Sequence, residues 1–194
     1  MIRTATLIAA LTALPFGAHA EMARYTLDRD HVVVAFLVDH LGYEKVLGRF
    51  TDISGGFSFD PESRELGLVE VRLGAASVQS DNDARDGHVR SKDFLNADEF
   101  PDITFTAEGG TPDSATTGTV AGTLTVRGVS QPLTLDVTLN KIADYPFGHG
   151  KETIGISARG SILRSGFGMD YAVANGFVGD SVDIIIEAEA YLAD

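Results

Sequence analysis

Apolar and polar residues alternate through most of this chain, and this period-two pattern limits the folds that it can adopt. In TVAGTLTVRG (residues 119–128), valines, a leucine and glycines occupy every second position, with threonine, alanine or arginine between them. The pattern returns at residues 133–139, 154–162 and 182–190 and, near the start, at residues 34–40. Alternation of this kind is typical of strands with one buried face. The sequence therefore predicts an all-β domain.

The number and spacing of these segments predict a closed sheet. Roughly eight strands with short connections fold most readily into a β-barrel, because an open sheet of that size leaves unpaired edges. Residues 119–127 and 133–139 form the clearest hairpin, with a turn expected over residues 127–132. In residues 66–73 the apolar phase shifts by one position, which predicts a bulge near Gly67.

One long stretch, residues 85–101 (RDGHVRSKDFLNADEFP), interrupts the alternation. Asn82 or Asp83 could cap a helical turn before it, and Pro101 directs the chain back into an extended conformation. We therefore expect a short helical plug around residues 82–97, which covers the mouth or the flank of an apolar cavity.

The barrel interior is either packed with side chains or open to one elongated ligand. Small residues on the expected inward face leave room, namely Gly122, Ala158, Gly160, Ala188 and Ala190. In the alternative arrangement, large side chains from facing strands fill this room. An open cavity would be walled by Val, Ile, Leu and Phe with almost no charge. It would bind an apolar chain rather than a sugar or a nucleotide.

Residues 1–20 (MIRTATLIAALTALPFGAHA) are organised as a secretory signal. Arg3 precedes an apolar run, Pro15 breaks it, and small residues end at Ala20, where cleavage is expected. The run is too short for a membrane-spanning helix. Cleavage leaves residues 21–194 as a single exported domain.

The charge and the composition exclude several classes of function. The sequence has 15 Lys and Arg against 28 Asp and Glu, and its net charge changes from −13 to −14 when Arg3 is removed with the signal. Such acidity disfavours nucleic acid and anionic membrane surfaces as partners. The chain has no cysteine, so disulfides, cysteine nucleophiles and zinc–thiolate sites are excluded. It contains no nucleophile elbow, phosphate loop or dinucleotide fingerprint, and we expect no catalytic residue and no cofactor.

Four histidines remain after processing: His31, His40, His88 and His149. They are scattered along the sequence, and no two of them have helical ligand spacing. We expect no transition-metal site, because only folding could bring them together.

Polar side chains gather in the expected plug and at a nearby strand end: Arg85, Asp86, His88, Arg90 and His40. In one interpretation they form a cationic rim that holds a polar head group while the tail lies inside the barrel. In the other, Arg85 pairs with Asp86 or Asp28 and pins the plug to the barrel. His40 shares the parity of Phe36 and Val38, so we expect it to point inward, as a hydrogen-bonded core histidine or as a head-group contact.

An ordered set of motifs runs from Tyr25 to Leu192. It comprises Tyr25-Thr-Leu-Asp28, His31, Phe36, His40-Leu-Gly42, Gly48-Arg-Phe50, Gly56, Arg85-Asp86-Gly-His88, Ser91-Lys-Asp93-Phe94, Phe100-Pro101-Asp-Ile-Thr-Phe105, Gly122-Thr-Leu-Thr-Val-Arg127-Gly128, Arg164-Ser-Gly-Phe167-Gly168 and Val178-Gly-Asp180-Ser-Val182. In this order the motifs resemble the YceI family. The sequence departs from that pattern at Val89, where many relatives carry Leu, and at Phe94-Leu95, which replaces a common aromatic pair.

The resemblance implies a lipocalin-like antiparallel β-barrel, exported to the bacterial periplasm, whose pore takes a polyisoprenoid or a similar long-chain amphiphile. It implies no established catalytic residue. Members of the family are associated with isoprenoid quinones, stress responses and, in some cases, membrane b-type cytochromes. An isoprenoid lipid or isoprenoid quinone is therefore the expected ligand, and a membrane cytochrome is a further expected partner.

Three hypotheses follow. The first is a periplasmic carrier of an isoprenoid-type lipid, in which the chain acts as a monomer or a homodimer. Its expected wall residues are Phe36, Val38, Phe105, Leu124, Val126, Leu135, Val137 and Ile156, and its head-group or plug candidates are His40, Arg85, His88, Arg90 and Phe94. The second is an enzyme in which His88 or His40 acts as a base on a bound lipid. The third is a packed, non-catalytic partner of a membrane redox or stress-response system.

Overall fold

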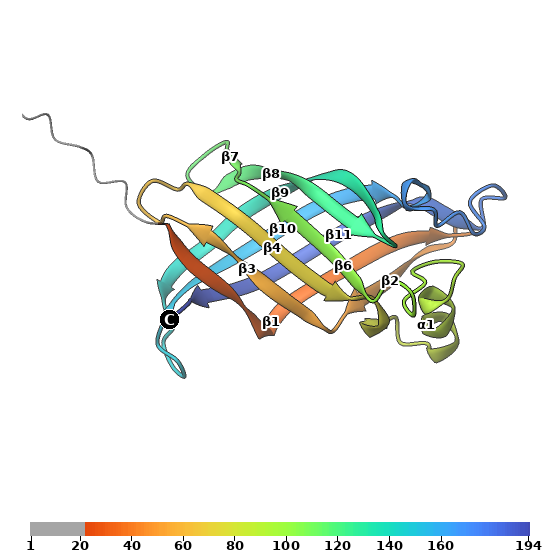
Figure 1. Cartoon of the computed structure of the whole chain (residues 1–194), viewed down its shortest axis with the longest axis horizontal. Helices are drawn as coiled ribbons and strands as arrows, with labels where there is room; N and C mark the ends of the chain where they lie inside the picture. Colours follow the sequence, from red (N-terminus) through yellow and green to blue (C-terminus); the bar gives the residue numbers. More distant parts are fainter. Residues whose placement is uncertain (1–21) are drawn as a thin grey trace, which may run out of the picture.

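The computed structural model describes residues 22–194, which form eleven strands, one α-helix and two 3₁₀ turns (Figure 1). The expected signal sequence, residues 1–20, lies outside the described residues. The strands are β1 (Ala23–His40), β2 (Glu44–Phe50), β3 (Ile53–Phe59), β4 (Leu66–Gly74), β5 (Val78–Gln79), β6 (Asp102–Ala107), β7 (Thr111–Pro112), β8 (Thr117–Val126), β9 (Val129–Asp144), β10 (Glu152–Leu163) and β11 (Val178–Leu192). The helix is α1 (Asp83–Arg90), and the 3₁₀ turns are Ala75–Ser77 and Arg164–Phe167.

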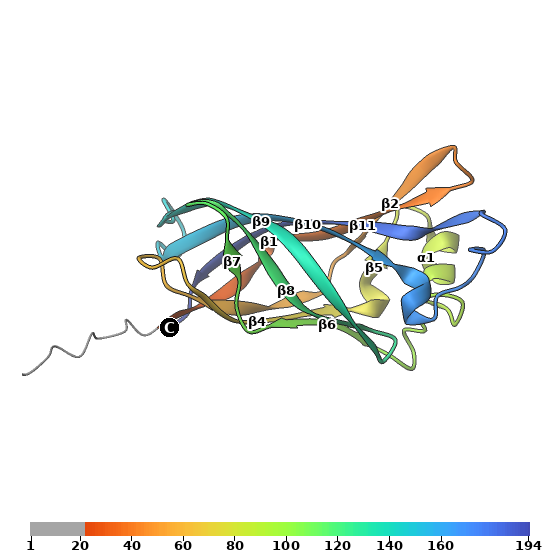
Figure 2. The same cartoon turned by 90° about the horizontal axis from the view of Figure 1, so that it is seen from above.

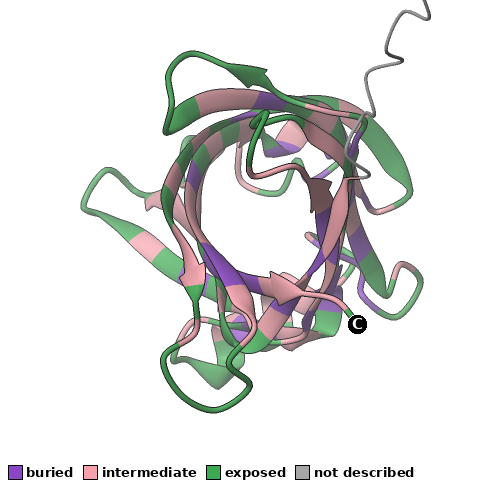
Figure 3. Ribbon diagram, turned by 90° about the vertical axis from the view of Figure 1, so that its left-hand side faces the viewer, coloured by how far each residue is buried: buried purple, intermediate pink, exposed green. Residues whose placement is uncertain are grey.

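Eight of the strands close into a single antiparallel barrel, as the alternation predicts. Their order is β11-β10-β9-β8-β6-β4-β3-β1, and β11 pairs again with β1 to complete the ring. Figure 3 shows the ring from the end opposite α1. The remaining strands are additions to it: β2 pairs with the second half of β1, β5 pairs with β2, and β7 pairs with β8.

The hairpin between β8 and β9 is tighter than the sequence analysis expected. Val126 pairs with Val129, so only Arg127 and Gly128 form the turn. Both have positive φ values, 51° and 71°, as in the two-residue turns that match the twist of a hairpin. Pro132, expected to end a longer turn, instead lies within β9 opposite Thr123.

Register shifts interrupt the pairing of the strands at four places among the described residues, and two of them matter here. The first confirms the bulge expected near Gly67, because two residues of β4 face one residue of β3 between the pairs Phe57–Val69 and Phe59–Leu66. The second is larger and was not predicted: residues 28–31 of β1 lie opposite the single residue Glu189 of β11.

The expected helical plug lies across one end of the barrel (Figures 1 and 2). Asn82, rather than Asp83, caps α1 by accepting a hydrogen bond from the Arg85 backbone N–H at 3.0 Å. After Ser91 the chain folds back through turns and buries Leu95 against the barrel, before β6 begins. Within residues 22–194, no helix combines the length and the apolarity that crossing a membrane requires.

Candidate functional site

The barrel encloses an apolar cavity of about 360 Å³. All eight strands of the ring contribute side chains to its wall, because the inward faces carry Val, Ile, Leu, Phe and Ala. The lining extends from the plug, where Val89, Phe94 and Leu95 contribute, to exposed residues of the segment 110–117 at the opposite end. The cavity is therefore covered at one end and reaches solvent at the other.

The eight residues expected to contact a lipid all line this cavity: Phe36, Val38, Phe105, Leu124, Val126, Leu135, Val137 and Ile156. Phe105, Leu124 and Leu135 are buried, and Val137 and Ile156 are half-buried. The parity of the strands thus places these side chains on one inner surface, while contact with a lipid stays a prediction.

The small inward-facing residues behave in two ways. Ala158 and Ala188 line the cavity and leave it open, as one alternative required. At Gly122 and Gly160, however, large side chains of neighbouring strands fill the space. A Cβ atom at Gly122 would lie 2.6 Å from the Phe105 ring, and one at Gly160 would lie 2.9 Å from a Leu135 methyl group. The interior is therefore partly packed and partly open.

A second hollow of about 340 Å³ lies between the plug, the β1–β2 hairpin and the segment before β11. Phe36, Val38, Val89, Phe94 and Val178 line both this hollow and the main cavity, so the two share a wall. Four of the five head-group candidates line the second hollow, namely His40, Arg85, His88 and Phe94. The fifth, Arg90, lines neither of the two and donates to the Val78 carbonyl at 3.3 Å.

The polar groups of the plug bind one another. Arg85 donates to the Ser80 hydroxyl at 2.7 Å and to the Ser80 carbonyl, while the same hydroxyl donates to the buried Asp86 carboxylate. Arg85 and Asp86 are thus joined through Ser80, which fits the structural interpretation of this pair. Asp28 does not take part, because its carboxylate contacts His31 instead.

Aromatic rings surround His88 in the second hollow. Its ring meets Phe94 and Tyr171 edge to face, with centroid distances of 5.0 and 4.8 Å. Its Nε2 lies 2.8 Å from an Asp93 carboxylate oxygen. This arrangement fixes the imidazole between two flat apolar surfaces and one negative charge.

His40 is not a core histidine, which was one of the two expectations for it. The pairing of β1 with β2 runs without a shift from Val34 to His40, so His40 keeps the side of Phe36 and Val38, and with them it lines the second hollow. His40 is exposed at the rim of the second hollow, where it pairs with Glu44 of β2.

Two arginines of the cavity wall were not selected from the sequence. Arg164 is 3 % exposed, and its guanidinium donates to backbone carbonyls that include those of Gly179 and Tyr171, each at 2.8 Å. Burial lowers the pKa of Arg164. Arg64 lines the opposite end and is exposed. Arg164 stands in one of the motifs shared with the YceI family, but nothing in that motif indicates that its side chain reaches the cavity from a turn, and Arg64 stands in none of them.

One group of side chains in residues 22–194 has spacing that suits a metal ion: Asp28, His31 and Glu189. It lies on the outer surface of the barrel rather than in the cavity. The fold therefore brings one of the scattered histidines next to two carboxylates, although the sequence predicted no such group.

Comparisons with known proteins agree with this architecture. The family profile of the YceI-like domain matches residues 25–190. Protein YceI of Shigella flexneri is 35 % identical over 180 residues, which cover 91 % of this chain and 92 % of the relative.

Solved structures show the same fold. The YceI protein of Campylobacter jejuni is 35 % identical, with a TM-score of 0.73 over 80 % of this chain and 90 % of that one. A polyisoprenoid-binding domain from Saccharophagus degradans, implicated in plant cell wall breakdown, has a TM-score of 0.65 at 16 % identity and covers 89 % of this chain and 99 % of that one.

Proposed function

The chain belongs to the YceI-like family, and from this premise and the apolar cavity of its barrel we propose that the protein binds a long-chain isoprenoid-type lipid and carries it in the bacterial periplasm. The lining of the cavity carries the proposal. Among the described residues, Arg64 and Arg164 are the only charged side chains on a wall that is otherwise almost entirely apolar. Burial of a lipid tail against such a wall contributes roughly 0.8 kcal/mol per CH₂ group. The fold shared with a polyisoprenoid-binding domain supports the same ligand class.

We place the tail in the main cavity and the head group in the second hollow. His40, Arg85 and His88 supply hydrogen-bonding groups there, and Phe94 lies between the two spaces. An isoprenoid quinone or another isoprenoid with an oxygen-bearing head group fits this division. The protein acts in this proposal without catalysis and without a separate cofactor, as a monomer or a homodimer, and a membrane cytochrome is a partner to test.

The first experiment is mass spectrometry of the protein purified gently from the periplasm, before and after solvent extraction. We expect about one isoprenoid-type lipid per chain in the wild type, and loss of at least 90 % of it in Leu124→Arg and in Leu135→Arg. A charge in the cavity removes apolar contact and must itself be solvated. Thr125→Arg is the matched control, because Thr125 lies on the outer face, where its hydroxyl contacts Ser130 at 2.9 Å.

An additional variant separates loss of binding from loss of folding. Ala158→Phe adds an uncharged ring to the cavity wall and costs about 1–3 kcal/mol of stability if the site cannot expand. It should fold and hold less lipid. Equal lipid retention in the Thr125, Leu124 and Leu135 variants would contradict the proposed site.

The same measurement tests the alternatives. A released lipid that differs from the one added, with the difference lost in His88→Ala, would indicate an enzyme. A protein that arrives empty and refuses added isoprenoids would leave only a role as a partner of another protein.

A further inference from the structure

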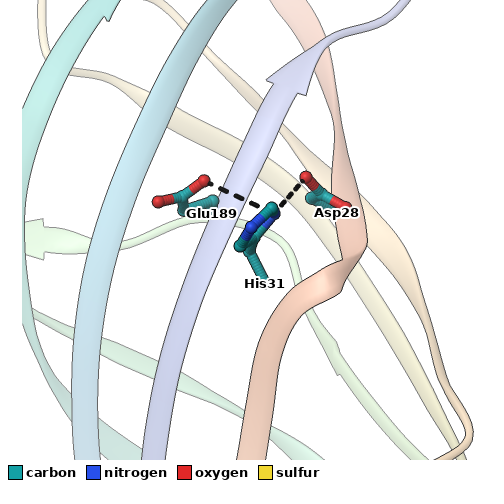
Figure 4. A group of neighbouring side chains, drawn as sticks. All are labelled: Asp28, His31 and Glu189. Atoms are coloured by element: carbon teal, nitrogen blue, oxygen red, sulfur yellow. Dashed lines mark hydrogen bonds and ion pairs between the residues drawn. The ribbon is translucent and has the colours of Figure 1, made fainter. Parts of the chain in front are cut away.

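The large irregularity of β1 gathers three side chains on the outside of the barrel (Figure 4). Residues 28–31 lie opposite Glu189 of β11, so β1 must bend outward there. Extra residues in one strand redirect their side chains, and such features often serve a site. Here Asp28 and His31, at the two ends of the insertion, both turn toward Glu189.

The distances between the three side chains suit a common ligand. Their ligand atoms lie within 4.8 Å of one another. His31 Nδ1 is 2.7 Å from Asp28 Oδ2 and 3.8 Å from Glu189 Oε2. Two donors that bind one ion at about 2.0–2.2 Å are separated by roughly 3.0–3.5 Å. The group therefore needs side-chain shifts of less than about 1 Å to hold an ion.

Glu189 supplies an independent observation. Its Oε2 atom is buried and has no hydrogen-bond partner among the described residues. The Glu189 side chain as a whole is 37 % exposed, and the partner of this oxygen is the His31 imidazole at the longer distance of 3.8 Å. A buried carboxylate oxygen without a hydrogen bond is costly, and a bound ion is one of the ordinary explanations for such an atom. The oxygen faces the His31 imidazole, so the space between them is where a cation would be stabilised.

The surrounding charge favours a cation as well. Asp28 and Glu189 contribute two carboxylates, and Asp30 adds a third nearby, since its backbone N–H donates to Asp28 Oδ1 at 3.0 Å. His149 also lies near Asp28, and Tyr145 lies near Glu189. A divalent ion would balance the two carboxylates that face it.

We propose that Asp28, His31 and Glu189 form a binding site for one divalent transition-metal ion, with zinc as the reference ion. One imidazole nitrogen and two carboxylates suit Zn²⁺ or Mn²⁺, whereas Mg²⁺ and Ca²⁺ prefer oxygen ligands throughout. Water completes the coordination. The ion joins β1 to β11 where their pairing is interrupted, and so it stabilises the closure of the barrel. This site is separate from the lipid cavity and from the proposed function.

The test measures zinc binding by isothermal titration calorimetry and thermal unfolding, with untagged protein freed of metal by a chelator. We expect one equivalent of Zn²⁺ to bind. At a free concentration of about 100 times Kd, the Tm should rise by about 5–10 °C. The same concentration of Mg²⁺ should leave the Tm unchanged.

Substitution of the proposed ligands tests whether zinc binds at this site. His31→Gln and Glu189→Gln should each weaken zinc binding by at least about 10–100-fold, the loss typical when even an outer partner of a metal ligand is removed. Glu187→Gln is the matched control, because Glu187 lies two positions away on β11 and is paired with Arg159. It should bind zinc as the wild type does.

Three results would overturn the proposal: no stoichiometric zinc binding, unchanged affinity in His31→Gln and Glu189→Gln, or an equal loss in Glu187→Gln. Circular dichroism without metal establishes that each variant is folded. If either His31→Gln or Glu189→Gln does not fold, the zinc affinity of the other variant decides whether the proposal holds.

Discussion

At the scale of single residues, Tyr25 links the barrel wall to a charged partner. Its side chain is fully buried, its ring stacks on Phe57 at a centroid distance of 5.8 Å, and its hydroxyl donates to the Glu152 carboxylate. Burial, with the hydrogen bond and the charge of Glu152, raises the pKa of Tyr25 far above its ordinary value. The folded state therefore keeps this proton at a pH where the unfolded chain releases it.

This difference predicts a loss of stability in alkali. Below about pH 10, the pKa of an unfolded tyrosine, the contribution of Tyr25 is present in full. Above it, the free energy of unfolding should fall by about 1.4 kcal/mol per pH unit from this group. Tyr25→Phe keeps the stacking, should cost about 1 kcal/mol at pH 7, and should show a shallower decline between pH 10 and 11.5. Urea unfolding at several pH values measures both effects.

Tyr43→Phe is the control for this comparison, because the Tyr43 side chain is 90 % exposed. It should follow the wild type across the whole range. If Tyr25→Phe declines as steeply as the wild type, other groups cause the alkaline loss.

Single residues also show what the sequence could predict about the site. Inward-facing positions follow from strand parity, so Leu124, Leu135 and Ile156 could be placed on the cavity wall. Parity gives the side on which a residue lies but not whether that side is covered, so it could not show that His40, on the side of Phe36 and Val38, is exposed at the end of β1. Arg164 was missed for another reason: its guanidinium is satisfied by carbonyls of the turn and of β11, and these partners meet only in the folded chain.

At the scale of elements, α1 depends on its cap. A helix of only eight residues has little stability of its own, and Asn82 satisfies one of its first free N–H groups. Asn82→Ala should therefore destabilise α1 by about 1 kcal/mol, while Asn82→Asp should retain the cap. Hydrogen exchange of the α1 amides should speed up in the alanine variant, with the strands unaffected.

Two hydrogen-exchange results would contradict this prediction for Asn82. Exchange in Asn82→Asp as fast as in Asn82→Ala would mean that the cap does not hold the helix. Faster exchange throughout the barrel in Asn82→Ala would mean that the plug and the strands unfold as one unit.

The elements differ in how far the sequence determines them. The β8–β9 hairpin, the bulge near Gly67 and the plug each have a local signal, and each was expected in about the right place. The insertion in β1 was not predicted, because residues 28–31 are four consecutive polar residues, Asp-Arg-Asp-His, which interrupt the alternation without distinguishing a bulge from a loop. Its geometry arises only from the requirement that β1 pair with β11 on both sides of it.

At the scale of the whole molecule, the first and last strands close the ring, and the ends of the described chain meet. The Ala193 N–H donates to the Arg24 carbonyl at 2.8 Å, so the last residues of the chain lie beside the start of β1. Neighbouring ends at the surface usually tolerate being joined.

A circular permutant follows from this arrangement. Residues 194 and 22 are joined by a short Gly/Ser linker, and new ends are opened between Phe147 and Gly148, in the exposed connection from β9 to β10. We expect its Tm to stay within about 5 °C of the wild type, because no strand is cut. Opening the chain between Leu135 and Asp136, within β9, should abolish cooperative unfolding. Equal stability of the two permutants would show that β9 need not be continuous.

Closure through β1 and β11 also sets an order in time. Strand β1 leaves the ribosome, and would leave an export channel, long before β11, the strand whose pairing with β1 closes the ring. Until β11 follows, the incomplete sheet has two open edges and its apolar face has no enclosure. The inner compartment therefore cannot exist during synthesis or threading. It forms only once β11 has paired with β1, so no cargo can be enclosed before the last strand is in place.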